Sequence, residues 1–138
     1  MKFIVRLVPH ACLLALAGCG SSSLSLEEQL QHVASTASSA TLFVQAWCDG
    51  NVPRDYAMRT VDRAGENLDR ISGAVASMPA SAGGVQEAMT EIERLEAAIA
   101  TARVALERED KIAARSSLDL LRQLESEARR QTLVEAGS

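Results

Sequence analysis

The amino-acid sequence predicts an all-α fold, an antiparallel bundle of four helices with up-down-up-down topology over residues 25–138 of the 138-residue chain. Apolar residues recur at alternating spacings of three and four, which is the period of one helical face and not that of a strand. Pro53 and Pro79 lie beside the turn-like stretches 49–51 and 80–84 and divide this pattern. The segments between these breaks have similar lengths and short connections, an arrangement typical of a bundle.

The first two helices are expected over about residues 24–48 and 52–78. Ser25 and Glu28 have the spacing of a capping box at the start of the first helix. Asn51 is the predicted N-cap of the second helix. The apolar stripe of the first helix comprises Leu26, Leu30, Val33, Ala37, Ala40, Val44 and Trp47. That of the second comprises Ala57, Val61, Ala64, Leu68, Ile71, Val75 and Met78.

The second half of the chain predicts two further helices separated by a tight turn. The stripe of the third helix comprises Val85, Ala88, Ile92, Leu95, Ile99, Ala102 and Leu106. Its next position would place Glu109 in the core, where an unpaired charge is costly, so the helix should end before it. Asp110 can cap a fourth helix after a turn over 107–110. The apolar stripe of that helix comprises Ala114, Leu118, Leu121, Leu124 and Ala128. One long bent helix is the alternative.

The first 18 residues have the order of charges and apolar residues found in an export signal. Lys2 and Arg6 precede the apolar run 7–17, which is too short to span a bilayer as a permanent helix. The tetrapeptide Leu16-Ala17-Gly18-Cys19 follows, and it resembles the lipobox of bacterial lipoproteins. This resemblance implies that a peptidase cuts before Cys19 after lipid is attached to its thiol, and that acyl chains such as palmitate anchor the mature protein.

The resemblance divides the chain into a signal peptide (1–18), a lipidated cysteine with a serine-rich tether (19–24) and the bundle domain. It implies a protein of the bacterial cell envelope. Gly20 follows the cysteine where an aspartate would favour the inner membrane, so an outer-membrane protein facing the periplasm is expected. Loss of Lys2 and Arg6 lowers the formal net charge from −4 to −6. This charge disfavours nucleic acid and anionic lipid surfaces as partners.

The residues available for catalysis are few, and we expect no enzyme, no cofactor and no metal site. Beyond the signal peptide, His32 is the one histidine, and Cys48 is the one cysteine besides the lipidated residue. They lie at opposite ends of the first helix, about 24 Å apart, and cannot form a nucleophile pair within one molecule. Glu28 and His32 share a helical face, but the Glu-x-x-His pairs of carboxylate-bridged metal bundles are absent.

Aromatic residues gather around the turn between the first two helices. Trp47, Tyr56 and Arg54 are residue types enriched at binding hot spots, and we expect them to form a contact surface for a partner. The alternative is a local plug that closes the end of the bundle. Cys48 lies among them as a free thiol, either shielded by its neighbours or able to form a disulfide-linked homodimer.

Two classes of function remain open. The first is a structural or interaction lipoprotein that binds another envelope protein, similar to a secretin pilot in size and architecture. The second is a sensor bundle that holds a small apolar ligand or a metal between its helices. Small residues inside the bundle permit either tight packing or a narrow cavity: Ala34, Ala37, Ala40, Ala98 and Ala102. We expect a monomer without metal.

Overall fold

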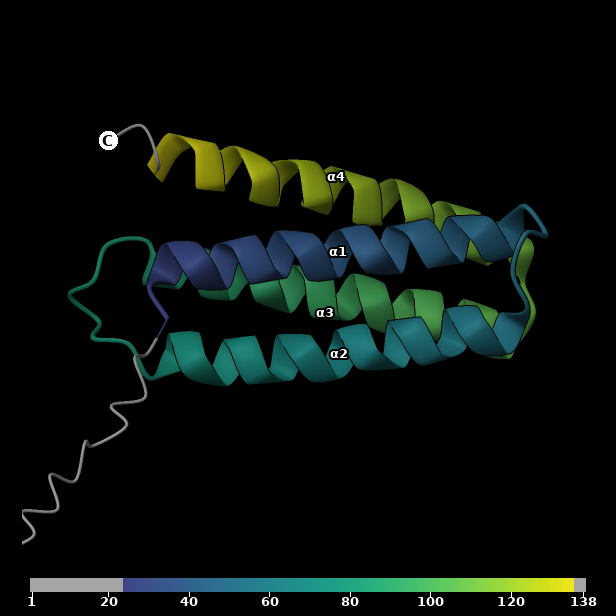
Figure 1. Ribbon diagram of the computed structural model, residues 1–138, viewed down its shortest axis with the longest axis horizontal. Helices are drawn as coiled ribbons and strands as arrows, with labels where there is room; N and C mark the ends of the chain where they lie inside the picture. Colours follow the sequence, from purple (N-terminus) through teal and green to yellow (C-terminus); the bar gives the residue numbers. More distant parts are fainter. Residues whose placement is uncertain (1–23, 136–138) are drawn as a thin grey trace, which may run out of the picture.

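Four helices and their short connections make up the structure, a computed structural model that describes residues 24–135, with side chains up to residue 130. The helices are α1 (Leu26–Cys48), α2 (Arg54–Ala76), α3 (Val85–Glu107) and α4 (Lys111–Glu135). Successive helices run antiparallel, so the α1–α2 and α3–α4 turns lie together at one end of the bundle (Figure 1). The start of α1, the α2–α3 loop and the end of α4 lie at the other end. The predicted four-helix bundle is confirmed, and α3 and α4 are separate helices.

Side chains that the sequence assigns to helix starts do cap α1 and α4. The Ser25 hydroxyl accepts a hydrogen bond from the Glu28 amide (3.2 Å), and the Glu28 carboxylate accepts one from the Ser25 amide (2.7 Å). The Asp110 carboxylate accepts hydrogen bonds from the amides of Ile112 and Ala113, at 3.0 and 2.9 Å. Each cap satisfies amides that have no partner inside the helix.

The start of α2 differs from the prediction. Pro53, not Asn51, is the N-cap residue, and no side chain caps this helix. Val52 precedes a proline, which disfavours the helical conformation at that residue and keeps the helix from starting earlier. Pro53 has a φ of −62° and lacks an amide hydrogen, so it fits a helix start without leaving a donor unsatisfied. The prediction that Asn51 caps α2 is therefore wrong.

The α3–α4 turn forms where the apolar repeat of the sequence breaks. Glu109 adopts a φ of 55°, in the left-handed region, and its charged side chain points to solvent and not into the core. The Asp110 amide donates to the Ala105 carbonyl (2.9 Å), which closes the last turn of α3 before the chain reverses. A continuous helix would have placed the Glu109 carboxylate between the helices at a large desolvation cost.

The predicted apolar stripes meet in one core. All of their members are buried except Leu26, Met78 and Val85 at the helix ends, which are partly exposed. Each helix packs against two neighbours, and α1 also contacts α3 across the diagonal. Their Cα atoms approach within 8 Å, whereas no described residue of α2 comes that close to α4.

Buried alanines explain why α1 and α3 approach each other more closely than α2 and α4 do. α1 and α3 bury Ala34, Ala37, Ala40, Ala88, Ala98, Ala102 and Ala105. A methyl side chain lets two helix backbones approach more closely than a leucine or isoleucine does, because interaxial distance follows the size of the contact residues. In the described residues these small side chains thus serve the close packing of α1 against α3.

We expect Ala102→Leu to destabilise the bundle by about 1–3 kcal/mol, because Ala102 is fully buried and extra methylenes there must push α1 and α3 apart. Urea unfolding followed by circular dichroism measures the change. Ala97→Leu, on the exposed face of the same helix, is the matched control and should change stability by less than about 0.5 kcal/mol. Equal effects of the two substitutions would contradict the close diagonal.

Candidate functional site

The aromatic turn between α1 and α2 lies at the opposite end of the bundle from the start of α1 (Figure 1). α1 spans 23 residues, or about 35 Å, between the tether and the α1–α2 turn. Figure 1 shows the chain entering α1 at one end and the turn at the other. Cys19, the predicted lipidation site, lies outside the described residues, and the same is true of the signal peptide. We call this end of the bundle, which contains the α1–α2 and α3–α4 turns, the tip.

Trp47 is part of the core and not of the tip surface. Its side chain is 6% exposed, and the Lys111 ammonium lies 5.6 Å from its ring centroid. Lys111 Nζ also donates to the Cys48 carbonyl (3.4 Å), so α4 covers the end of α1. The apolar stripe predicted for the first helix includes Trp47, which places this residue on the buried face. In the described conformation its ring closes the end of the bundle, as the plug alternative requires.

Tyr56 and Arg54 do lie on the surface of the tip. Tyr56 is 59% exposed, and the Arg59 guanidinium lies 5.3 Å above its ring. Arg54 forms ion pairs with Glu109 (3.0 Å) and Asp55 (3.4 Å), and the first of these joins the two turns at this end. The structure therefore leaves Tyr56 and Arg54 exposed at the surface, whereas Trp47 is buried.

Cys48 is a free thiol that is 3% exposed. Burial raises its pKa above the ordinary value and Asp49 acts in the same direction, while Arg115 and Lys111 partly oppose them. A raised pKa lowers the thiolate fraction and so the reactivity of the sulfur. The buried sulfur is out of reach of a second chain unless the tip opens. The structure thus favours the shielded thiol over the disulfide-linked dimer, the two alternatives that the sequence left open for Cys48.

His32 and Glu28 do not form part of a metal site in the described structure. His32 lines a shallow groove of about 380 Å³ between α1 and α2, and the Glu28 carboxylate accepts from Ser25. Residues 24–130 contain no cluster of three or more histidine, cysteine, aspartate or glutamate side chains placed to hold a metal. His32 is exposed and Cys48 is buried at the other end of α1, so the two cannot act as a pair.

A feature that the sequence analysis missed is the separation of charge between α1 and the opposite side of the bundle. From residue 29 to residue 48, α1 contains no acidic or basic residue except His32. The groove between α2 and α3, by contrast, is lined by Asp62, Glu66, Asp69 and Glu96, with one basic residue, Arg103, paired to Asp62. Burial raises the pKa of Glu96, and the negative charges of Asp69 and Glu93 add to the shift. The count of charges along each predicted helix could have revealed this asymmetry.

In the part of the chain that the structure describes, no helix is long and apolar enough to cross a membrane. Comparison of the chain with profiles of known protein families, with curated proteins and with solved structures finds no match. The functional argument therefore depends on the residues of this chain and on their arrangement.

We expect Cys48 to react slowly with iodoacetamide in the native protein and rapidly in denaturant, because burial both blocks the sulfur and raises its pKa. Intact-mass spectrometry over a time course follows the alkylation, and Cys48→Ser is the control that should show none at this position. On a non-reducing gel, the native protein should show no disulfide-linked dimer through Cys48. Cys48→Ser should therefore leave the pattern of bands unchanged. Alkylation at equal rates in both conditions would contradict the shielded thiol.

Proposed function

We propose that this protein is a lipid-anchored component of the bacterial cell envelope that acts as a non-enzymatic interaction module. The lipobox-like sequence ending at Cys19 carries the anchoring half of this proposal. Acyl chains on that residue would hold the bundle at a membrane. Gly20 favours attachment to the outer membrane, with the bundle facing the periplasm. More than one chain makes such an anchor stable, because a single acyl chain binds only marginally.

The arrangement of the bundle supports a binding role. The tether would leave the bundle at the start of α1, so the tip would project about 35 Å from the membrane if α1 points away from it. Tyr56 and Arg54 are exposed there and retain the role of a candidate contact, while Trp47 is buried in the core. Tyrosine and arginine are the types of residue that most often carry binding energy at interfaces.

A binding role accounts for the structure better than catalysis or ligand storage. His32 and Cys48 lie at opposite ends of α1, so the two side chains best suited to nucleophilic chemistry are far apart. A small-ligand sensor would hold its ligand between the helices, where the buried stripes of all four helices instead pack against one another. The described grooves open at the surface between neighbouring helices.

The experiment that tests this function combines N-terminal chemistry with contact mapping in the native cell. Mass spectrometry of the mature protein should show an N-terminal cysteine, residue 19, that carries diacylglycerol. A photo-crosslinking amino acid in place of Tyr56 should give a discrete protein adduct, and one in place of Gln86, at the opposite end of the bundle, should not. Cys19→Ala should abolish both the lipid and the Tyr56 adduct.

A mature chain that starts at another residue, or that carries no lipid, would refute the anchor. Equal adducts at the two crosslinking positions, or none at either, would refute the tip as the contact. Immunoblotting of total protein separates loss of contact from loss of the protein itself.

A further inference from the structure

α1 presents a narrow uncharged strip to solvent along most of its length. The exposed residues of this strip are Gln31, His32, Ser35, Ser39, Leu42 and Gln45. Leu42 lies near the centre and is 62% exposed, which makes it the main apolar group of the strip. A helix on the surface of a soluble bundle usually turns charged residues outward. The uncharged outer face of α1 therefore calls for an explanation.

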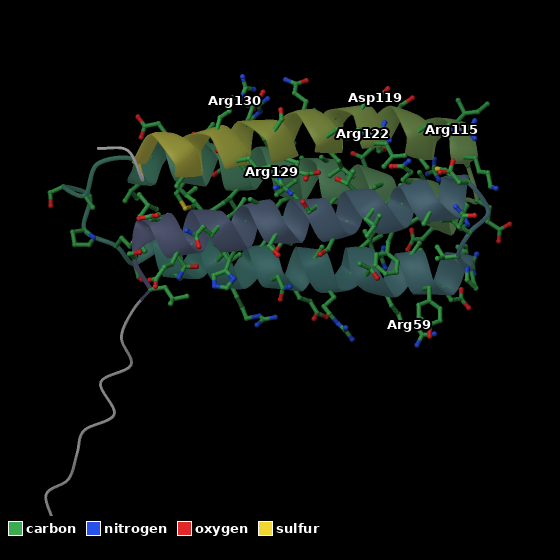
Figure 2. The ribbon with its side chains drawn as sticks, turned by 45° about the horizontal axis from the view of Figure 1, so that its top comes forward. Arg59, Arg115, Asp119, Arg122, Arg129 and Arg130 are labelled. Atoms are coloured by element: carbon green, nitrogen blue, oxygen red, sulfur yellow. The ribbon has the colours of Figure 1, made fainter. Side chains whose placement is uncertain are left out.

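Three arginines of α4 border the strip on one side. Arg115, Arg122 and Arg129 are spaced by seven residues, so they follow one another along one stripe of the helix. Arg122 Nη2 donates to the Gln45 side chain (3.0 Å), and Arg129 Nη2 donates to the Ser38 hydroxyl (2.7 Å). Figure 2 shows this row along α4 on the side that faces α1, whereas Arg130 points away.

Two arginines of α2, Arg63 and Arg70, border the strip on the other side. Arg59, Arg63 and Arg70 lie on one stripe of α2, and none of them forms an ion pair with a described residue. Arg63 and Arg70 line the two adjoining grooves between α1 and α2, of about 380 and 320 Å³. Both grooves also contain His32, Thr36 and Asn67.

The acidic residues of the two bordering helices that lie near these rows are few. On α4, Asp119 lies 3.6 Å from Arg122 and Glu125 lies 2.9 Å from Arg129. On the α2 side, Asp62, Glu66 and Asp69 line the groove toward α3 instead. Glu66 lies between Arg63 and Arg70 in the sequence but forms an ion pair with neither. The protein is acidic overall, yet five arginines border the uncharged outer face of α1. We call this strip with its two arginine rows the α1 face.

We propose that the α1 face is a docking surface for an acidic amphipathic helix of a partner protein. Arginines seven residues apart on α4 are separated by about 10.5 Å, which is the rise between successive heptads of a second helix. A helix lying along α1 would place apolar residues on Leu42 and glutamates beside the arginine rows. The rows would then act as the flanking charges of a coiled coil do, by selecting partner and register.

A helix fits this face better than an anionic membrane does. Asp119 and Glu125 lie among the arginines of α4, and they would repel the continuous negative charge of a lipid surface. A partner helix carries its carboxylates at discrete positions and can avoid them. This inference rests on the proposed interaction role, to which it adds the chemistry of the partner. It does not depend on the lipid at Cys19 or on the Tyr56 contact.

The test uses the protein purified in neutral detergent and two synthetic helical peptides. Both peptides carry leucine at heptad core positions, flanked by glutamate in the probe and by lysine in the matched control. Fluorescence anisotropy should show binding of the glutamate peptide alone, with an affinity that falls at least about tenfold between 50 and 300 mM salt, because screening weakens exposed charge pairs.

Charge reversal on the α1 face should weaken this binding on either side of the strip. Arg63→Glu and Arg122→Glu should each raise Kd at least about fivefold, and Leu42→Ala should also raise it. Arg130→Glu, a reversal at an exposed residue outside the α1 face, is the control and should leave Kd within about twofold. Arg63 has no ion pair with a described residue, so its reversal should leave the thermal melt unchanged and keep the test valid even if Arg122→Glu lowers stability.

Three outcomes would overturn the inference. The first is that the glutamate and lysine peptides bind equally well, or that neither peptide binds. The second is an effect of Arg130→Glu as large as that of Arg63→Glu. The third is tighter binding to phosphatidylglycerol vesicles than to the glutamate peptide, lost in Arg63→Glu, which would assign the face to a membrane. None of these three outcomes would change the lipid on Cys19 or the Tyr56 adduct. Failure of the docking inference can therefore be distinguished from failure of the proposed function.

Discussion

The close approach of α1 and α3 across the bundle is the contact on which the rest of the structure depends. Alanines such as Ala37 and Ala102 are fully buried on these helices, and side chains this small let the two backbones come near each other. Leucines such as Leu68 and Leu121 fill the remaining space from α2 and α4. The bundle is thus compressed along one diagonal, and α1 contacts all three other helices.

This compression also determines which surface α1 exposes. α1 packs against three neighbours, and the strip that it leaves exposed carries hydroxyls, amides and Leu42. The helices on either side, α2 and α4, supply the arginines that border it. Because α3 and the facing side of α2 hold many of the acidic residues, one packing arrangement yields an acidic side and an arginine-bordered side.

Local signals in the sequence were enough to predict the helices, their apolar stripes and two of their caps. The Ser25 capping box, the Asp110 cap and the turn before it depend only on residues within a few positions, and all three are confirmed. Asn51 was a plausible cap by the same reasoning, but the conformational restriction imposed by Pro53 on Val52 outweighed it.

The surface was harder to predict because it depends on contacts between helices. The pairs Arg94 with Glu127 and Arg103 with Asp62 join residues 33 and 41 positions apart. The burial of Trp47 beneath Lys111 could have been inferred, since its stripe assignment conflicted with its assignment as a contact. The arginine rows required knowledge of which sides of α2 and α4 face α1, and periodicity alone does not provide it.

Methyl NOEs between alanines, recorded on protein with ¹³C-labelled alanine methyl groups, test the compressed diagonal most directly. Alanines of α1 and α3 are buried at many levels of the bundle, whereas α2 and α4 bury few, among them Ala64 and Ala114. The account predicts NOEs between alanine methyls of α1 and α3 and none between those of α2 and α4. NOEs between α2 and α4 without any between α1 and α3 would contradict it.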